Sequence, residues 1–219
     1  IPGWAEFALR FFMFSVIVPT LNEARHVADL HRQRLRYPQV QWIVVDGGST
    51  DDTLKALRTY DDWTVFAVTP GGRARQMNEG ARHTTGDVLI FLHADSQLPD
   101  QWPALISSAL RDGGAVGGAF HIWYHSQTIP AWLCHWLAFR SRHTHIPYGD
   151  QAIFARRSVF EIIGGYPNQP LLEDYEFSKR MRRLGPIHIL PQAVQTSPRR
   201  FEQGGVIRTG LLMKAIRLL

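Results

Sequence analysis

The sequence has 219 residues, 45% of them hydrophobic and 20% charged, which is an ordinary composition for a globular protein with a sizeable core. Its single cysteine, Cys134, excludes an intrachain disulfide and a cysteine zinc cluster, and no apolar run reaches the roughly 18 residues of a membrane-spanning helix. Lys and Arg outnumber Asp and Glu by 24 to 19, and this net charge of +5 favours an anionic partner, but the arginines are scattered and no nucleic-acid-binding motif is present.

The first half of the chain alternates short apolar runs with helical patterns. Met13 stands directly before the first clear strand, so residues 1–12 are treated as a leader or remnant outside the fold. The expected strands cover residues 14–19, 42–46, 64–68 and 87–92, and the expected helices cover residues 22–36, 51–57 and a segment after residue 72, with Asn22 capping the first helix. This alternation predicts an α/β fold with a mostly parallel sheet and helices on both faces.

The second half is less regular. Strands are expected at residues 115–124 and 152–155, and helices at residues 129–142 and 171–184. Residues 206–219 form a basic amphipathic pattern, which fits either packing on the domain or a peripheral contact with a membrane. No linker separates the two halves, so we expect one domain over residues 13–219.

Acidic side chains follow three of the predicted strands. Glu23, Asp46 and Asp95 each come shortly after a strand, and ligands of parallel sheets bind at the carboxyl ends of the strands. Each residue alone is explained by a turn or cap, whereas together they indicate one site. The sequence lacks the glycine motifs of dinucleotide-binding and P-loop proteins and the nucleophile elbow of α/β-hydrolases.

These segments carry a resemblance to a known family. Residues 16–23 (VIVPTLNE), 45–53 (VDGGSTDDT), 91–95 (FLHAD) and 172–174 (LED) resemble, in order, the signatures of family-two glycosyltransferases. Residues 149–151 (GDQ) and 197–201 (SPRRF) are similar to further segments of a bacterial subgroup. The resemblance implies the Rossmann-like GT-A fold, with a nucleotide-sugar half over about 13–112 and an acceptor half over about 113–205. It also implies a nucleotide-diphosphate-sugar donor, of which a uridine one is favoured.

The resemblance assigns the donor site to the first half. It implies that Pro19, Thr20 and Glu23 line the nucleoside pocket and that Asp46 pairs with the base. Arg73 matches a basic position near the nucleotide, and a glycine turn that opens a helix suits a phosphate group. Without the resemblance, Arg73 is equally well explained as a solvated residue at a helix start.

The metal motif departs from the usual pattern of the family. Where the family has Asp-x-Asp, this chain has His93-Ala94-Asp95. The resemblance implies that Asp95 holds Mn²⁺ or Mg²⁺, which prefer oxygen ligands, although Mn²⁺ also accepts imidazole. His93 has three interpretations: a metal ligand, a contact to the nucleotide ribose, or a support for the loop.

The catalytic assignments fall in the second half. Asp174 matches the general base of the family and Glu173 its supporting acid, although acids at a helix start are also explained by the helix dipole alone. Asp150, Gln151, Arg199 and Arg200 match segments that contact the acceptor or the diphosphate, and Phe201 stands where the subgroup commonly has tryptophan. The aromatic residues Trp123, Tyr124, Trp132, Trp136, Phe139 and Tyr148 fit either core packing or sugar binding.

The leading hypothesis is an inverting glycosyltransferase that moves a sugar to an acceptor hydroxyl, the acceptor being a small molecule, a lipid or a glycan. The alternative is a sugar-nucleotide-binding module without turnover, which the histidine of the metal motif favours. A nucleotidyltransferase is a third reading, but the expected glycine- and lysine-rich loop is missing. The lone cysteine and the missing signal-peptide features predict a cytoplasmic location, with a peripheral contact to the inner face of the membrane as a variant.

Overall fold

The computed structural model describes residues 12–68, 72–111, 114–124 and 146–197, together with positions 130, 132, 134 and 139. The predictions for residues 1–11, for Arg199 and Arg200, for Phe201 and for the helix at 206–219 therefore lie outside the described residues. So does most of the helix expected at 129–142.

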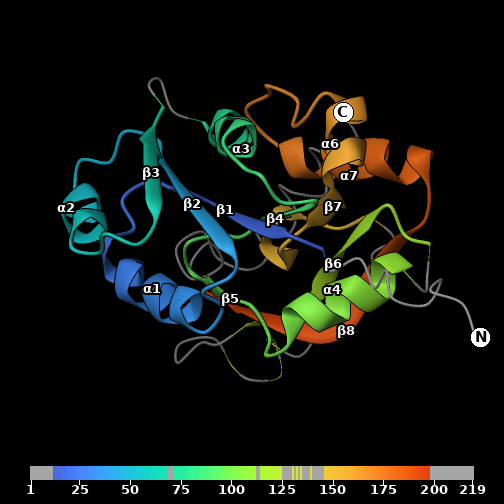
Figure 1. The fold of residues 1–219 in the computed structure, drawn as a ribbon, viewed down its shortest axis with the longest axis horizontal. Helices are drawn as coiled ribbons and strands as arrows, with labels where there is room; N and C mark the ends of the chain where they lie inside the picture. Colours follow the sequence, from blue (N-terminus) through green and yellow to red (C-terminus); the bar gives the residue numbers. More distant parts are fainter. Residues whose placement is uncertain are drawn as a thin grey trace, which may run out of the picture.

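One sheet runs through both predicted halves of the chain (Figure 1). Its strands are β1 (Phe14–Thr20), β2 (Gln41–Asp46), β3 (Thr64–Ala67), β4 (Val88–Phe91), β5 (Ser96–Gln97), β6 (Gly117–Tyr124), β7 (Phe154–Arg156) and β8 (Ile187–Thr196). Their order is β3-β2-β1-β4-β7-β6-β8-β5. The pairs β2–β3, β1–β2, β1–β4 and β6–β8 are parallel, whereas β7 is antiparallel to β4 and to β6, and β5 is antiparallel to β8. This confirms the α/β fold with a mostly parallel sheet.

Helices cover both faces of the sheet, as predicted. The described helices are η2 (Ala24–His26), α1 (Val27–Leu35), α2 (Thr53–Arg58), α3 (Arg73–Arg82), α4 (Trp102–Arg111), η3 (Gly149–Gln151), α6 (Arg157–Ile163) and α7 (Glu173–Leu184). Figure 1 shows α3, α6 and α7 above the sheet and α1 and α4 below it. Each helix layer closes its own hydrophobic core against one face of the sheet.

The alternation of β1 shows how the sequence builds these two cores. Val16 and Val18 point into the core under α1, α2 and α4, while Ile17 points into the core under α3, α6 and α7. All three side chains are fully buried, which contributes about 1.5–3 kcal/mol each. Because side chains of a strand alternate between faces, an uninterrupted apolar run fits only a strand that is covered on both sides.

The structure corrects the role of Asn22. The side chain of Asn22 does not cap a helix; its Oδ1 accepts hydrogen bonds from the backbone N–H groups of Thr50 at 2.8 Å and Asp51 at 3.3 Å. Asn22 itself has a left-handed backbone with φ of 57°, which asparagine tolerates better than most residues. It therefore joins the loop after β1 to the loop after β2.

Several elements were absent from the sequence prediction. These are α4, α6, β5 and β8. The helix that the sequence predicts over 171–184 is present as α7, but it begins at Glu173. Strand β8 is ten residues long but contains Pro191 and has an irregular burial pattern, and a register shift between Phe120 and His121 of β6 accompanies it. A strand without clean alternation has no clear sequence signal.

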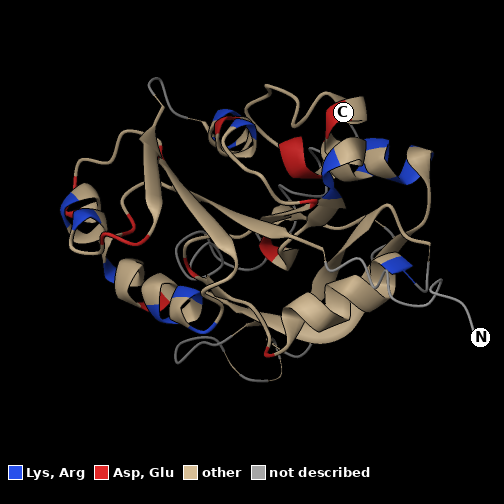
Figure 2. Cartoon of the chain, in the orientation of Figure 1, with Lys and Arg blue, Asp and Glu red and all other residues tan. Residues whose placement is uncertain are grey.

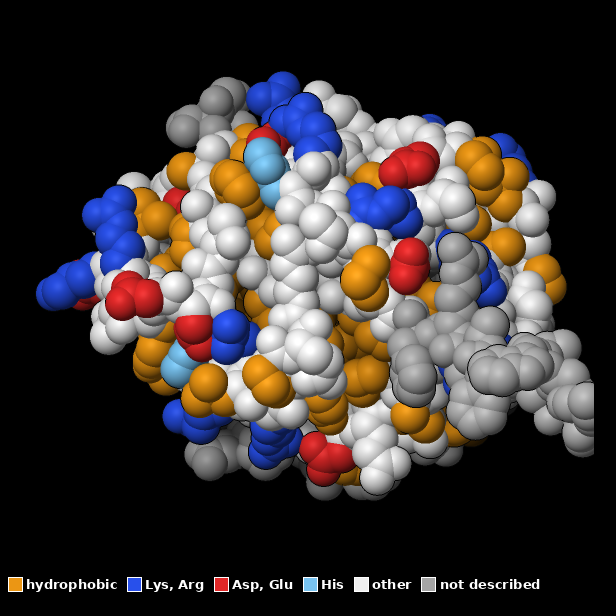
Figure 3. Space-filling model, in the orientation of Figure 1, with side chains coloured by type: hydrophobic (Ala, Val, Ile, Leu, Met, Phe, Trp, Pro, Cys, Tyr) orange, Lys and Arg blue, Asp and Glu red, His pale blue; other side chains and the backbone are white. Residues whose placement is uncertain are grey.

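Charges are spread over the outer surfaces of the helices. Figure 2 shows Lys and Arg on α1, α2, α3 and α7, with the acidic residues of α7 at its start and its basic residues toward its end. On the face drawn in Figure 3, basic side chains lie apart from one another with acidic ones among them. No helix within the described ranges has the length and apolar character needed to cross a bilayer.

Candidate active site

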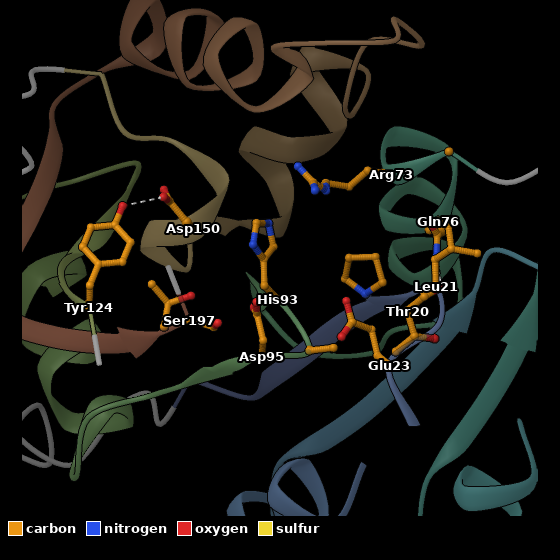
Figure 4. A pocket seen from close by; sticks show the side chains of 14 residues that line it. Thr20, Leu21, Glu23, Arg73, Gln76, His93, Asp95, Tyr124, Asp150 and Ser197 are labelled. Carbon is orange, nitrogen blue, oxygen red and sulfur yellow. Dashed lines mark hydrogen bonds between the residues drawn. The ribbon is translucent and has the colours of Figure 1, made fainter. Parts of the chain in front are cut away.

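A cavity of about 340 Å³ opens at the carboxyl ends of β1 and β4 (Figure 4). It is lined by Pro19, Thr20, Leu21, Glu23, Gly72, Arg73, Gln76, His93, Ala94, Asp95, Tyr124, Asp150, Thr196 and Ser197. The residues come from the end of β1, the start of α3, the loop after β4, the ends of β6 and β8, and η3. Seven of the predicted site residues thus share one cavity: Pro19, Thr20, Glu23, Arg73, His93, Asp95 and Asp150.

Gln76 lines this cavity and holds the ends of β1 and β2 together, a role that the sequence motifs do not predict. Its buried Nε2 donates hydrogen bonds of 2.8 Å to the carbonyl oxygens of both Thr20 and Val45. A Cβ on Gly47 would lie 3.0 Å from the Gln76 amide, so the chain passes close to this side chain. The available signal was a polar residue on the inward face of α3, since buried polar groups are hydrogen-bonded as a rule.

Asp46 lies at the end of β2 but is fully buried and does not line the cavity. Its Oδ1 accepts hydrogen bonds from the backbone N–H groups of Gly48 and Ser49, each at 2.9 Å, and its other oxygen accepts one from the Ser49 hydroxyl. In this arrangement the carboxylate organises the turn after β2. The contact of Asp46 with a nucleotide base stays a prediction.

The loop after β4 carries the two candidate metal ligands. His93 and Asp95 both face the cavity (Figure 4). Gln33 of α1 holds this loop, because its Nε2 donates to the carbonyl of Ser96 at 3.0 Å and its Oε1 accepts the N–H of Leu98 at 3.0 Å. The chain just after His93 and Asp95 is therefore held by α1, which packs on the other face of the sheet from α3.

The donor set fits a divalent ion that shares its coordination with a phosphate ligand. An imidazole and a carboxylate are acceptable to Mn²⁺, and Mg²⁺ is usually bound through one or two carboxylates together with substrate phosphates. In the part of the chain that the structure describes, no group of three or more His, Cys, Asp or Glu side chains gathers around one point. The residues thus suit a metal that arrives with a phosphate-bearing ligand better than a self-sufficient metal cage.

Asp174 does not line the cavity, but its carboxylate lies close to His93 of the loop after β4. It is buried in the first turn of α7, and its Oδ2 accepts a 2.6 Å hydrogen bond from the backbone N–H of Gly149. A Cβ on Gly149 would lie 2.9 Å from Asp174 Oδ2 and 3.1 Å from His93 Nε2, so both atoms converge on the same point. The absence of a side chain at 149 permits this approach.

The neighbouring residues connect the two halves of the site. Glu173 is buried, and its Oε1 lies 3.4 Å from Nη1 of Arg73, which faces the cavity. The Tyr124 hydroxyl donates a 3.1 Å hydrogen bond to Oδ2 of Asp150 (Figure 4). Gln151 is buried outside the cavity, where its Nε2 donates to the carbonyl of Phe120 at 3.0 Å and anchors η3 to β6.

A buried tyrosine lies in the electrostatic field of these acids. Burial raises the pKa of Tyr166 well above its ordinary value, and the carboxylates of Asp174 and Glu173 raise it further, against a smaller opposing effect of Arg73. The hydroxyl of Tyr166 therefore stays protonated at neutral pH. Among the described residues it finds no hydrogen-bond partner.

Comparison with known proteins places this site in a family context. The model of the family described as glycosyl transferase family 2 matches residues 15–164. A probable glycosyltransferase, YdaM, of Bacillus subtilis is 27% identical over 223 aligned residues, which cover 89% of this chain and 52% of that protein. A PGL/p-HBAD biosynthesis glycosyltransferase of Mycobacterium bovis is 30% identical over 195 residues, covering 77% of this chain and 69% of the relative. The chain thus spans about half the length of the Bacillus relative.

Solved structures with the same fold include two sugar-nucleotide complexes. The mannosyltransferase PcManGT from Pyrobaculum calidifontis, in complex with GDP-Man and Mn²⁺, has a TM-score of 0.68 at 22% identity and covers 94% of this chain and 64% of its own. Residues 1–349 of TarS from S. aureus, in complex with UDP-GlcNAc, have a TM-score of 0.68 at 17% identity and cover 84% of this chain and 58% of their own. At these identities the likeness establishes the fold.

Proposed function

The chain belongs to glycosyl transferase family 2, and from this membership we propose that it is an inverting enzyme that moves a sugar from a nucleotide diphosphate sugar to an acceptor hydroxyl. The observation that carries the proposal is the convergence of Arg73, His93 and Asp95 on one cavity, with Asp174 Oδ2 and His93 Nε2 both close to where a Cβ of Gly149 would lie. UDP-GlcNAc and GDP-Man in the structural neighbours support this donor class, and we favour a uridine donor from the sequence motifs.

The donor would bind across the carboxyl ends of the strands. Pro19, Thr20 and Glu23 line the cavity at the end of β1, and the nucleoside would bind against them. The diphosphate would lie near Arg73 at the start of α3, because a helix N-terminus presents unpaired N–H groups and a partial positive charge to phosphate oxygens. Arg199 and Arg200 remain proposed diphosphate contacts, since the arginine fork matches phosphate oxygens.

Asp95 is the proposed ligand for Mn²⁺ or Mg²⁺, with His93 as the second candidate. When bound, such an ion supplies positive charge that offsets the negative charge of the departing diphosphate. The remaining chemistry belongs to side chains of the protein.

Asp174 is the proposed general base. The acceptor oxygen forms a bond to the anomeric carbon while the bond from that carbon to the phosphate oxygen breaks, and Asp174 takes the proton of the acceptor hydroxyl. Attack opposite the leaving group inverts the anomeric centre, as in the single displacement of inverting glycosidases. The hydrogen bond from Gly149 fixes one carboxylate oxygen, and the N–H of Tyr175 donates to the other at 2.7 Å.

A sugar-nucleotide-binding module without turnover is the second candidate function. It is favoured by one specific observation, the histidine that replaces the first carboxylate of the metal motif. For the enzyme we also propose a cytoplasmic location, with a peripheral membrane contact through the basic amphipathic residues 206–219.

The test is transfer and nucleotide release from a panel of UDP and GDP sugars with Mn²⁺ present. We expect turnover in the wild type, and in Asp174→Asn a fall in kcat of about 10²–10⁴-fold at unchanged nucleotide affinity, because an amide cannot take the proton and can accept only one of the two backbone hydrogen bonds. Glu176→Gln is the matched control, since Glu176 lies on the same helix but pairs with Arg180 at the surface, 2.9 Å away. Full activity in Asp174→Asn removes the base assignment, and tight binding without turnover of any donor favours the module.

A further inference from the structure

Helix α3 contacts the segment that leads to the proposed base at a position that the mechanism above does not use. The side chain of Asn78 forms a two-pronged clamp on the backbone of Tyr166: Nδ2 donates to the carbonyl at 2.8 Å, and Oδ1 accepts the N–H at 2.8 Å. These hydrogen bonds join residues that are 88 positions apart in the sequence. They satisfy both backbone groups of Tyr166, which is a buried residue.

The turn before Tyr166 is shaped to fit this clamp. Gly164 and Gly165 both have left-handed backbones, with φ of 80° and 76°. A Cβ on Gly165 would lie 2.5 Å from Asn78 Oδ1, whereas a Cβ on Gly164 would meet nothing within 4 Å. The turn therefore needs glycine at 165 for the close approach of Asn78, and at 164 only for its backbone conformation.

The ring of Tyr166 passes the position of this turn on to the catalytic elements. It stacks on Phe177 of α7, with ring centroids 4.3 Å apart, and meets Phe91 edge-on at 4.8 Å. Phe177 lies one turn beyond Asp174 on α7, and Phe91 ends the strand that leads to His93. Packed interiors transmit small shifts because they have few voids.

Helix α3 makes a second contact at the other end of the segment that runs from Tyr166 to Glu173. Arg73, at the start of α3, pairs with Glu173, so α3 holds the chain both at Tyr166 and at the start of α7. Between these points Leu172 adopts a left-handed backbone with φ of 59°. A strained conformation of this kind persists only where the surrounding structure holds it.

We propose that Asn78 is a positioning residue for the reaction: by clamping Tyr166 to α3, it holds α7 so that Asp174 keeps its hydrogen bond with Gly149 and its place near His93. The same helix would face the donor diphosphate through Arg73, so α3 links the donor site to the placement of the base. This inference rests on the proposed function of Asp174.

The test compares four variants, each assayed for nucleotide release with acceptor present and with water alone. In Asn78→Ala and in Gly165→Ala we expect kcat to fall 10- to 100-fold, with the donor KM and the affinity for UDP changed less than threefold. Asn168→Ala, an exposed residue of the same loop, and Gly164→Ala, which meets no neighbour, are the controls and should keep kcat within threefold of the wild type.

The double variant Asn78→Ala with Asp174→Asn tests whether Asn78 acts through Asp174. If it does, the double variant is no slower than Asp174→Asn alone; a further tenfold loss would mean an independent role and would overturn the inference. Hydrogen exchange of the Tyr166 amide gives a readout without turnover, since it should speed up in Asn78→Ala. If Asn78→Ala does not fold, Gly165→Ala carries the test from the other side of the clamp.

The outcomes separate this inference from the function on which it rests. A wild type without transfer or donor hydrolysis removes both. An active wild type whose kcat survives both Asn78→Ala and Gly165→Ala leaves the glycosyltransferase standing and overturns the role of Asn78. An equal loss in Gly164→Ala and Gly165→Ala also overturns it, because backbone strain alone would then explain the effect.

Discussion

Glycine at position 149 allows two reactive side chains to reach the same point. Asp174 Oδ2 and His93 Nε2 both lie close to where its Cβ would be, and its N–H fixes the carboxylate. A base that is held by the backbone needs little reorganisation when an acceptor arrives. His93 therefore lies near the proposed base Asp174 as well as on the loop after β4 that carries the candidate metal ligands. Neither the sequence motif of His93 nor its residue type predicts this closeness to Asp174.

Tyr166 offers a residue-scale test of the electrostatics around the base. Its hydroxyl is buried without a partner among the described residues, and a buried hydroxyl without a hydrogen bond costs about 1–3 kcal/mol. Tyr166→Phe keeps the ring contacts, so we expect an unchanged or higher free energy of unfolding at pH 7, by up to about 1 kcal/mol. Urea denaturation measures this difference.

The pH dependence of the same variant follows from the raised pKa of Tyr166. In the unfolded chain the phenol loses its proton near its ordinary pKa of about 10, while in the folded protein it keeps it. Stability from this group is therefore complete below about pH 10 and declines as the pH rises above that value. We expect the advantage of Tyr166→Phe to widen between about pH 9 and 11. If the stability difference between Tyr166→Phe and the wild type stayed constant or shrank over this range, the pKa of Tyr166 would not be raised.

At the scale of elements, α3 is the helix on which the site depends. Its inward face carries Gln76, which binds the ends of β1 and β2, and Asn78, which binds the turn before α7. Its first residue, Arg73, faces the cavity. One short helix thus touches the cavity and the segment that leads to Asp174, the proposed base.

Gln76→Ala tests the contact of α3 with the sheet. Gln76→Ala removes two buried hydrogen bonds, although the carbonyl of Thr20 keeps the N–H of Gly47 and that of Val45 keeps the hydroxyl of Thr20. We therefore expect the free energy of unfolding to fall by about 1–3 kcal/mol. Nucleotide affinity should fall with it, because the floor of the cavity loosens. Arg82→Ala, an exposed residue on the same helix, should change stability by less than about 0.5 kcal/mol. Equal stability of the two variants in urea would refute this role of Gln76.

At the scale of the whole molecule, the sequence predicted the first half of the fold better than the second. The strands β1, β2 and β4 are continuous apolar runs at a covered sheet, which leaves few alternatives. Strand β8 is half exposed and contains Pro191, so it has no such pattern. Asn22 was assigned to a helix cap because capping is the commonest role of asparagine before a helix, whereas its contact is with a loop 28 residues away.

The candidate site was also only partly predictable from the sequence. Parallel strand ends predicted that Glu23, Asp46 and Asp95 share one edge of the sheet, and of these Glu23 and Asp95 line the cavity whereas Asp46 does not. The contacts of Asp174 with Gly149, and of Asn78 with Tyr166, depend on how α7 and the preceding turn pack on the sheet. Packing of this kind is set by many side chains at once, and no local motif encodes it. The family resemblance named Asp174 but not the groups that hold it.

The GT-A fold explains why residues so distant in sequence can act together. One sheet carries β1 and β4 of the predicted nucleotide-sugar half and β6 and β7 of the predicted acceptor half, and the cavity is lined by residues of both. We therefore propose that a nucleotide sugar bound in this cavity presents its anomeric carbon to Asp174.

The most direct test is a crystal structure of the protein with a UDP sugar analogue that resists transfer and with Mn²⁺. We expect the diphosphate beside Arg73 and Asp95, and the carboxylate of Asp174 on the face of the anomeric carbon opposite the diphosphate, with space for one acceptor hydroxyl between them. A donor bound elsewhere on the molecule, or a sugar separated from Asp174 by protein, would contradict it.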